Sequence, residues 1–139
     1  MMNTDSHKKI DEELFESDGD LTIYDGMPFT GIGYDPFPNG GDVEYETSYK
    51  AGLPHGYKRK WHDSNQLAYE ITYINGLKHG KEVHWYSDGE VKSESMFEFG
   101  IKVHSKTWDE KGNIIDQFSI DPESSNYKLL MQRRKSAGE

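Results

Sequence analysis

The chain repeats itself every 24 residues, and this period restricts it to folds built from similar units stacked side by side. One block holds Tyr49, Gly52, Gly56, Trp61, Leu67 and Glu70, and the next holds Tyr73, Gly76, Gly80, Trp85, Val91 and Glu94. A third, one residue shorter and with Val103 in place of the second glycine, holds Phe97, Gly100, Trp108, Gly112 and Ile114. A degenerate block precedes them, with Tyr24, Gly26, Gly31, Gly40 and Glu46. The period predicts a repeat array over residues 22–120 rather than a single catalytic domain.

Each block is predicted to form one β-hairpin followed by a connector. In the clearest block, KEVHWY and EVKSESMF are rich in residues that favour strands, and SDG between them is typical of a turn. Gly89 closes that turn because glycine adopts positive φ without a clash at Cβ. The other repeated glycines are predicted to mark chain reversals: Gly52, Gly56, Gly76, Gly80, Gly100 and Gly112.

The geometry of the turns decides which side chains share a face of the predicted sheet. A two-residue loop places Trp85 on the face of Lys92, whereas a loop with a glycine bulge places Trp85 opposite Val91. The second register separates apolar from polar residues, and it pairs Trp61 with Leu67 and Trp108 with Ile114. It predicts one core face that carries the repeated aromatic residues Tyr49, Trp61, Tyr73, Trp85, Phe97 and Trp108.

The opposite face is predicted to be polar and to face either water or a partner. Glu46, Glu70 and Glu94 keep the repeat spacing, and the register places Glu70 opposite Lys58 and Glu94 opposite Glu82. Two like charges directly opposed destabilise a sheet, so the second pair either receives a cation from a partner or is relieved by solvent or by a nearby lysine. The candidate partner-binding residues are Glu46, Glu70, Glu82 and Glu94.

The flanks are predicted to cap the sheet. Residues 1–21 form an acidic segment with a short helix over residues 8–16, and residues 121–139 form a capping helix over 122–134 and a frayed tail. Asp121 is the expected N-cap and Pro122 the expected first helical residue. The predicted fold is therefore mostly β: an elongated single-layer antiparallel meander of about four hairpin repeats, with short flanking helices at one or both ends.

Charge favours a protein partner of opposite sign. The chain has 25 acidic and 16 basic residues, a net charge of −9. Such a chain repels phosphate backbones and anionic lipid headgroups, so neither nucleic acid nor membrane is an expected partner. A basic protein is the expected partner, because opposite charge speeds association. Without a long apolar run or a signal-peptide pattern, the protein is expected in the cytoplasm.

Catalytic, cofactor and metal sites are not predicted. Paired carboxylates such as Glu82 and Glu94 need a pocket that shifts their pKa values before they act in proton transfer, and a single-layer sheet offers none. His55 and His79 belong to the repeated PHG and KHG connectors and do not form a ligand set of known spacing. The chain has no cysteine, which excludes disulfides and thiol chemistry.

The segment YINGLKHGKEVHWYSDGEVKSESM resembles the MORN repeat, and specifically the bacterial variant of YwqK-type antitoxin and immunity proteins. This resemblance implies an elongated antiparallel sheet and neutralisation of a partner toxin. We therefore predict a non-enzymatic binding protein that occludes a cognate toxin. The alternatives are a MORN-type scaffold that joins proteins or self-associates, including as a homodimer, and an accessory domain of an enzyme. A neighbouring gene for a secreted toxin with a basic domain distinguishes the first from the others.

Overall fold

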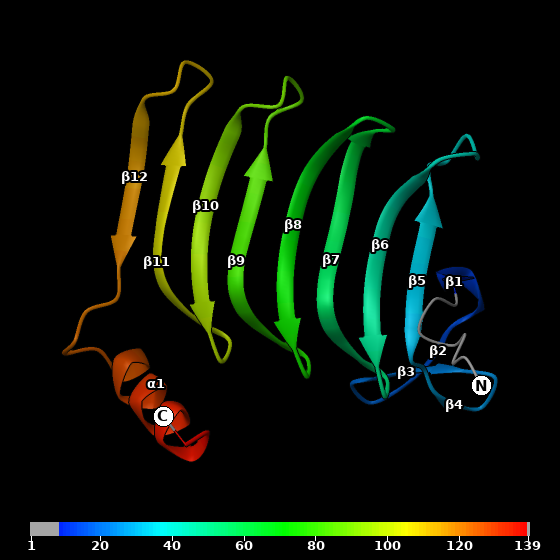
Figure 1. Ribbon diagram of the computed structural model, residues 1–139, viewed down its shortest axis with the longest axis horizontal. Coiled ribbons are helices and arrows are strands. Elements are labelled where there is room, and N and C mark those ends of the chain that lie inside the picture. Colours follow the sequence, from blue (N-terminus) through cyan, green and yellow to red (C-terminus); the bar gives the residue numbers. More distant parts are fainter. Residues whose placement is uncertain (1–8, 139) are drawn as a thin grey trace.

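The computed structural model describes residues 9–138, and its main feature is a nine-stranded sheet in the order β1-β5-β6-β7-β8-β9-β10-β11-β12 (Figure 1). All neighbouring strands are antiparallel except β1 (Lys9–Asp11), which runs parallel to β5. The meander from β5 onward is elongated and mainly antiparallel, as the repeat pattern predicts. Its strands are β5 (Gly31–Pro36), β6 (Val43–Lys50), β7 (Leu53–Asp63), β8 (Gln66–Ile74), β9 (Leu77–Trp85), β10 (Val91–Glu98), β11 (Ile101–Trp108) and β12 (Ile114–Ser119).

The N-terminal flank packs against the β5 end of the sheet. It contains a single 3₁₀ turn, η2 (Glu12–Leu14), and a second sheet of β2 (Glu16–Asp18), β3 (Leu21–Tyr24) and β4 (Met27–Pro28). The predicted helix over residues 8–16 is wrong in the described residues, and residue 8 lies outside them. A short helix is marginal by itself, and here Phe15 is extended instead, with its ring 4.8 Å from that of Phe29 and 5.7 Å from that of Tyr49. Residues 22–28, which the repeat pattern assigned to the array, lie in the second sheet.

The predicted pairs beside the hairpin turns are confirmed, but each hairpin contains a bulge just beyond them. Trp61 lies opposite Leu67, and the following pair is Lys60 with Tyr69, so Ala68 is an extra residue. The same irregularity recurs in the four hairpins β5–β6, β7–β8, β9–β10 and β11–β12 and keeps the repeat period, at Glu44, Ala68, Lys92 and Ile115. A one-residue shift sends all following side chains of that strand to the opposite face.

The prediction of one apolar and one polar face is therefore wrong. Pairing places Trp61, Trp85 and Trp108 on one side of the sheet, which we call the tryptophan face. Tyr45, Tyr69 and Tyr73 lie on the other side, the tyrosine face. The six predicted core aromatics divide between the two, because Tyr49, Tyr73 and Phe97 lie on the tyrosine face, and all six are half-buried. The buried apolar side chains are Phe29, Ala68, Ile71, Ile101 and Leu130.

The repeated histidines hold the turns at the opposite ends of these strands. Nδ1 of His55 accepts the backbone N–H of Asn75 at 3.1 Å, and Nδ1 of His79 accepts that of Phe99 at 3.0 Å. Asn75 and Phe99 both have positive φ and precede a glycine, which is the pattern of a two-residue hairpin turn. Five of the predicted turn glycines lie at chain reversals and have positive φ: Gly52, Gly76, Gly89, Gly100 and Gly112. The prediction is wrong for Gly56 and Gly80, which also have positive φ but lie inside β7 and β9, where the pairing with β6 and β8 is irregular.

The C-terminal helix α1 (Ser125–Ser136) packs beside the β10–β11 turn. It begins later than predicted, because Asp121 instead closes the preceding turn by accepting the backbone N–H of Glu123, and Ser124 is the N-cap. Leu130 is 1% exposed, and Arg134 forms two hydrogen bonds to Glu98 at 2.6 and 2.8 Å. The end of the predicted tail, residue 139, lies outside the described chain.

The two flanks contact only the two ends of the sheet, and neither flank covers a face of the sheet along its whole length. Figure 1 shows no other described segment over β8 and β9. Both faces are therefore open at the middle of the array, which is where a binding surface can lie.

Candidate functional site

Eight side chains form a cross-strand row on the tryptophan face, one from each strand from β5 to β12. Each lies directly opposite the next, in the order Tyr34, Glu46, Arg59, Glu70, Val83, Glu94, Lys106 and Gln117. Three of the four predicted glutamates, Glu46, Glu70 and Glu94, thus share one face and recur every second strand. Glu82 lies on the tyrosine face.

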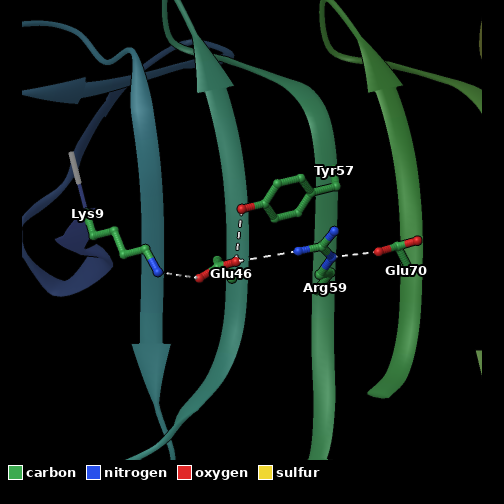
Figure 2. Close-up of polar contacts among 5 residues, drawn as sticks. All are labelled: Lys9, Glu46, Tyr57, Arg59 and Glu70. Carbon is green, nitrogen blue, oxygen red and sulfur yellow. Dashed lines mark hydrogen bonds and ion pairs between the residues drawn. The ribbon is translucent and has the colours of Figure 1, made fainter. Parts of the chain in front are cut away.

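Glu46 is the most buried member of the row, at 7% exposed, and three side chains satisfy it (Figure 2). Tyr57 Oη donates to Glu46 Oε1 at 2.9 Å, Lys9 Nζ lies 3.4 Å from Oε2, and Arg59 Nη1 lies 4.0 Å from Oε1. Burial, followed by the hydrogen bond to the Glu46 carboxylate, raises the pKa of Tyr57 to about 12. Tyr57 therefore remains a protonated donor at neutral pH.

Arg59 joins the first two glutamates of the row. Its Nε donates to Glu70 Oε2 at 2.6 Å, and its guanidinium lies 3.8 Å from the centre of the Tyr57 ring (Figure 2). The predicted pairing of Glu70 with Lys58 is wrong, since Lys58 lies opposite Ile71 on the tyrosine face. The bulge at Ala68 causes this difference.

Glu82 does not face Glu94, contrary to the prediction. The bulge at Lys92 moves the register, so that Ser95 lies opposite Glu82, and Val83 lies opposite Glu94. Glu82 instead accepts hydrogen bonds from His84 Nε2 and Lys78 Nζ, both at 2.6 Å. The bond from His84 and the bond and charge of Lys78 outweigh burial and lower the pKa of Glu82 to about 2.

We expect Glu82 to contribute to stability against acid. The pKa of this carboxyl falls from the ordinary 4.5 to about 2 on folding, so its contribution is present above about pH 4.5 and is lost as the pH falls toward 2. Glu82→Gln should lower the melting temperature at pH 7 and reduce the further loss between pH 4.5 and 2. Melting curves across this range measure both; an unchanged acid dependence in the variant would contradict the pairing.

Glu94 differs from the other three predicted residues because it is exposed and has no ion pair within 4 Å among the described residues. Its neighbours across the strands are Val83 and Lys106. With His104, Lys106 and Trp108 it lines a shallow depression of about 340 Å³. The part of the row that remains available to a partner is therefore the stretch from β9 to β11.

Sequence reasoning missed the cations of the row, although a signal for them is present. Arg59, Val83 and Lys106 occupy equivalent positions of successive repeats, each directly after a glutamate of the row. Valine in the second copy removes the cation there. Within the row, Glu70 on β8 can thus pair only with Arg59 on β7. Glu94 on β10 faces Val83 on β9, which supplies no cation.

The arrangement suits recognition of another molecule's surface. The carboxylates of Glu46, Glu70 and Glu82 are held by cations, so they are poorly placed to take up a proton in catalysis. Across residues 9–138, no three His, Asp or Glu side chains are grouped closely enough to hold a metal ion. Within the same residues, no helix has the length and apolar character needed to cross a membrane.

Hairpin repeats that keep one set of charged and aromatic side chains on an open face define a MORN-type repeat protein. Residues 54–75 and 78–98 match the MORN repeat variant family. Over 127 residues, the chain is 44% identical to the immunity protein YwqK of Bacillus subtilis strain 168. The aligned region covers 91% of this chain and 80% of that protein. No solved structure shows a significant match. The chain belongs to the family of YwqK, and the resemblance seen in the sequence is confirmed.

Proposed function

We propose that this protein is a cytoplasmic immunity protein that binds a cognate toxin and blocks it by occlusion. The observation that carries the proposal is the 44% identity to an immunity protein along most of both chains. The open middle of the sheet supports direct binding, because a stable protein–protein interface needs about 800 Å² from each partner. Catalysis has no part in this function.

The tryptophan face between β9 and β11 is the proposed contact surface. Trp85 and Trp108 are half-buried there, and Glu94 lies between their strands with no ion pair among the described residues. Tryptophan is enriched at the residues that dominate binding energy, and an unpaired carboxylate suits a lysine or arginine of a basic toxin.

The deciding experiment is co-expression with the toxin domain encoded by a neighbouring reading frame. We expect cells that carry both proteins to survive, and the two proteins to elute together in size-exclusion chromatography. Survival without complex formation would reject occlusion, and death in the presence of soluble immunity protein would reject the function.

Two substitutions on this face should separate binding from folding. We expect Trp85→Ala to weaken toxin binding by about 2 kcal/mol, because it removes a large aromatic contact. Glu94→Lys should weaken binding through repulsion of a basic partner, whereas Asp116→Lys, the matched reversal on the exposed edge strand β12, should not. Calorimetry measures the affinities, and equal binding by the two lysine variants would move the interface away from Glu94.

Self-association is a second candidate function, favoured by the edge strand β12. All six of its residues are exposed, including Ile115 at 61% and Phe118 at 41%. An exposed apolar edge strand can pair with a second copy. A scaffold that acts in this way would show concentration-dependent dimers in analytical ultracentrifugation, and Ile115→Lys would abolish them; a monomer at all concentrations would reject this alternative.

A further inference from the structure

The two ends of the strands differ in charge. The connections 37–42, 64–65, 86–90 and 109–113 lie along one rim of the sheet, and the turns 51–52, 75–76 and 99–100 lie along the other (Figure 1). The three turns of the second rim contain no Asp or Glu, and the one acid directly beside them, Glu98, is paired with Arg134. We call the first rim the acidic rim. Its connections contain one basic residue, Lys111. The acidic residues in these connections or directly beside them are Asp42, Asp63, Asp88, Glu90, Asp109 and Glu110.

A cleft of about 560 Å³ lies on this rim, between the 37–42 connection and the end of β7. The connection contains the FPNGGD segment that interrupts the repeat pattern. Phe37 supplies an apolar wall, and Asp42 and Asp63 supply carboxylates. This volume is above the about 300 Å³ at which ligand pockets begin, so the cleft has room for a side chain of a partner.

The charges around the cleft favour a cation. No Lys or Arg lines it, and His62 in its wall is held by a hydrogen bond of 2.7 Å between Nε2 and the carbonyl oxygen of Trp85. Asp63 uses one oxygen to accept the backbone N–H of Asn65, which leaves the other oxygen available. The carboxylate of Asp42 forms no hydrogen bond or ion pair with any described residue.

The cleft is continuous with the part of the tryptophan face formed by β6 and β7. Asp42 and Ser64 also border a second depression of about 230 Å³, which reaches Glu46 and Trp61 on the tryptophan face. A partner on the proposed contact surface between β9 and β11 would reach the cleft only if it also extended across β8 to β7 and β6.

Resting on the immunity function proposed above, we propose that this cleft receives a lysine or arginine from a basic segment of the toxin. The cationic head lies between Asp42 and Asp63, and the aliphatic stem packs against Phe37. The remaining carboxylates of the acidic rim steer the basic segment toward the cleft.

The experiment compares the double variant Asp42→Asn/Asp63→Asn with wild type. Asparagine keeps the oxygen that accepts the N–H of Asn65, so the turn is retained while two charges are removed. The control is Asp116→Asn/Glu123→Gln, which removes two exposed charges away from the acidic rim. Each protein is titrated with acetyl-tetra-arginine amide by NMR, and separately with the toxin domain of the neighbouring gene.

We expect the peptide to shift the amide signals of residues 37–42 and 62–64 in wild type and control. The double variant should bind both the peptide and the toxin about tenfold more weakly. Peptide-induced shifts spread evenly along the rim, or equally weakened binding by the control variant, would overturn the proposal that the cleft is the binding site. Full toxin binding by the double variant would overturn the proposed cleft site while leaving the immunity function intact. Failure of wild type to bind the toxin, with a normal peptide titration at the cleft, would instead reject the immunity function.

Discussion

Arg59→Leu is expected to lower the free energy of unfolding by about 1 to 3 kcal/mol, less than the loss of one partner of a fully buried ion pair costs, because the Arg59 side chain is 34% exposed. The substitution leaves Glu46, which is 7% exposed, with Tyr57 and the more distant Lys9 as its described partners. It also releases Glu70 and removes the guanidinium from the Tyr57 ring. Urea unfolding followed by tryptophan fluorescence measures the change.

The cause of this loss can be separated from the loss of side-chain packing. In Arg59→Leu/Glu46→Leu no buried charge remains, and two apolar side chains lie opposite each other, so most of the stability should return. Arg59→Lys keeps the charge but lacks the guanidinium fork, and should be intermediate. If the double variant is no more stable than Arg59→Leu, the loss of a cation beside the Glu46 carboxylate is not the cause.

Leu130→Ala should detach helix α1 from the sheet at a cost of about 2 to 5 kcal/mol. Leu130 is the most buried large side chain of the described chain, at 1% exposed. The helix is anchored otherwise by polar contacts of Arg133 with the Phe99 carbonyl and of Arg134 with Glu98. Hydrogen exchange of the helix amides should therefore accelerate more than that of the strand amides at the centre of the sheet.

Leu129→Ala is the matched control for this prediction. The chemical change is the same one residue away, but Leu129 is 37% exposed, so the loss should stay below about 1 kcal/mol. Similar losses in the two variants would show that helix propensity, rather than the burial of Leu130, determines the stability of this end.

The positions of the hairpin turns were predictable because they depend on neighbouring residues. The pairs Trp61–Leu67, Trp85–Val91 and Trp108–Ile114 follow from turn chemistry in SDG-like segments, and the structure contains all three. The C-terminal helix was predictable from the same local signals, but its first residue was not. Asp121 and Ser124 are both good caps, and the turn that Asp121 closes decides between them.

The partners of the candidate residues depend on an irregularity that has no residue signature. Ala68, Lys92 and Ile115 have nothing chemical in common, yet each is the extra residue of its hairpin. Because the bulge exchanges the faces of the strand beyond it, the glutamates were assigned the wrong opposite residues even though Glu46, Glu70 and Glu94 do share a face.

The sequence by itself determined the period, the turns, the mainly antiparallel meander and the relation to the YwqK family, since these depend on residues close together in the chain. Only the tertiary structure decided that both faces carry apolar and polar side chains, and that Arg59 joins Glu46 to Glu70. It also decided that Phe15 is extended rather than helical and packs in an aromatic cluster. The physical reason is the same in each case. Side chains far apart in the chain compete for burial and for a partner of opposite charge, and the outcome depends on strand register, which a one-residue bulge is enough to change.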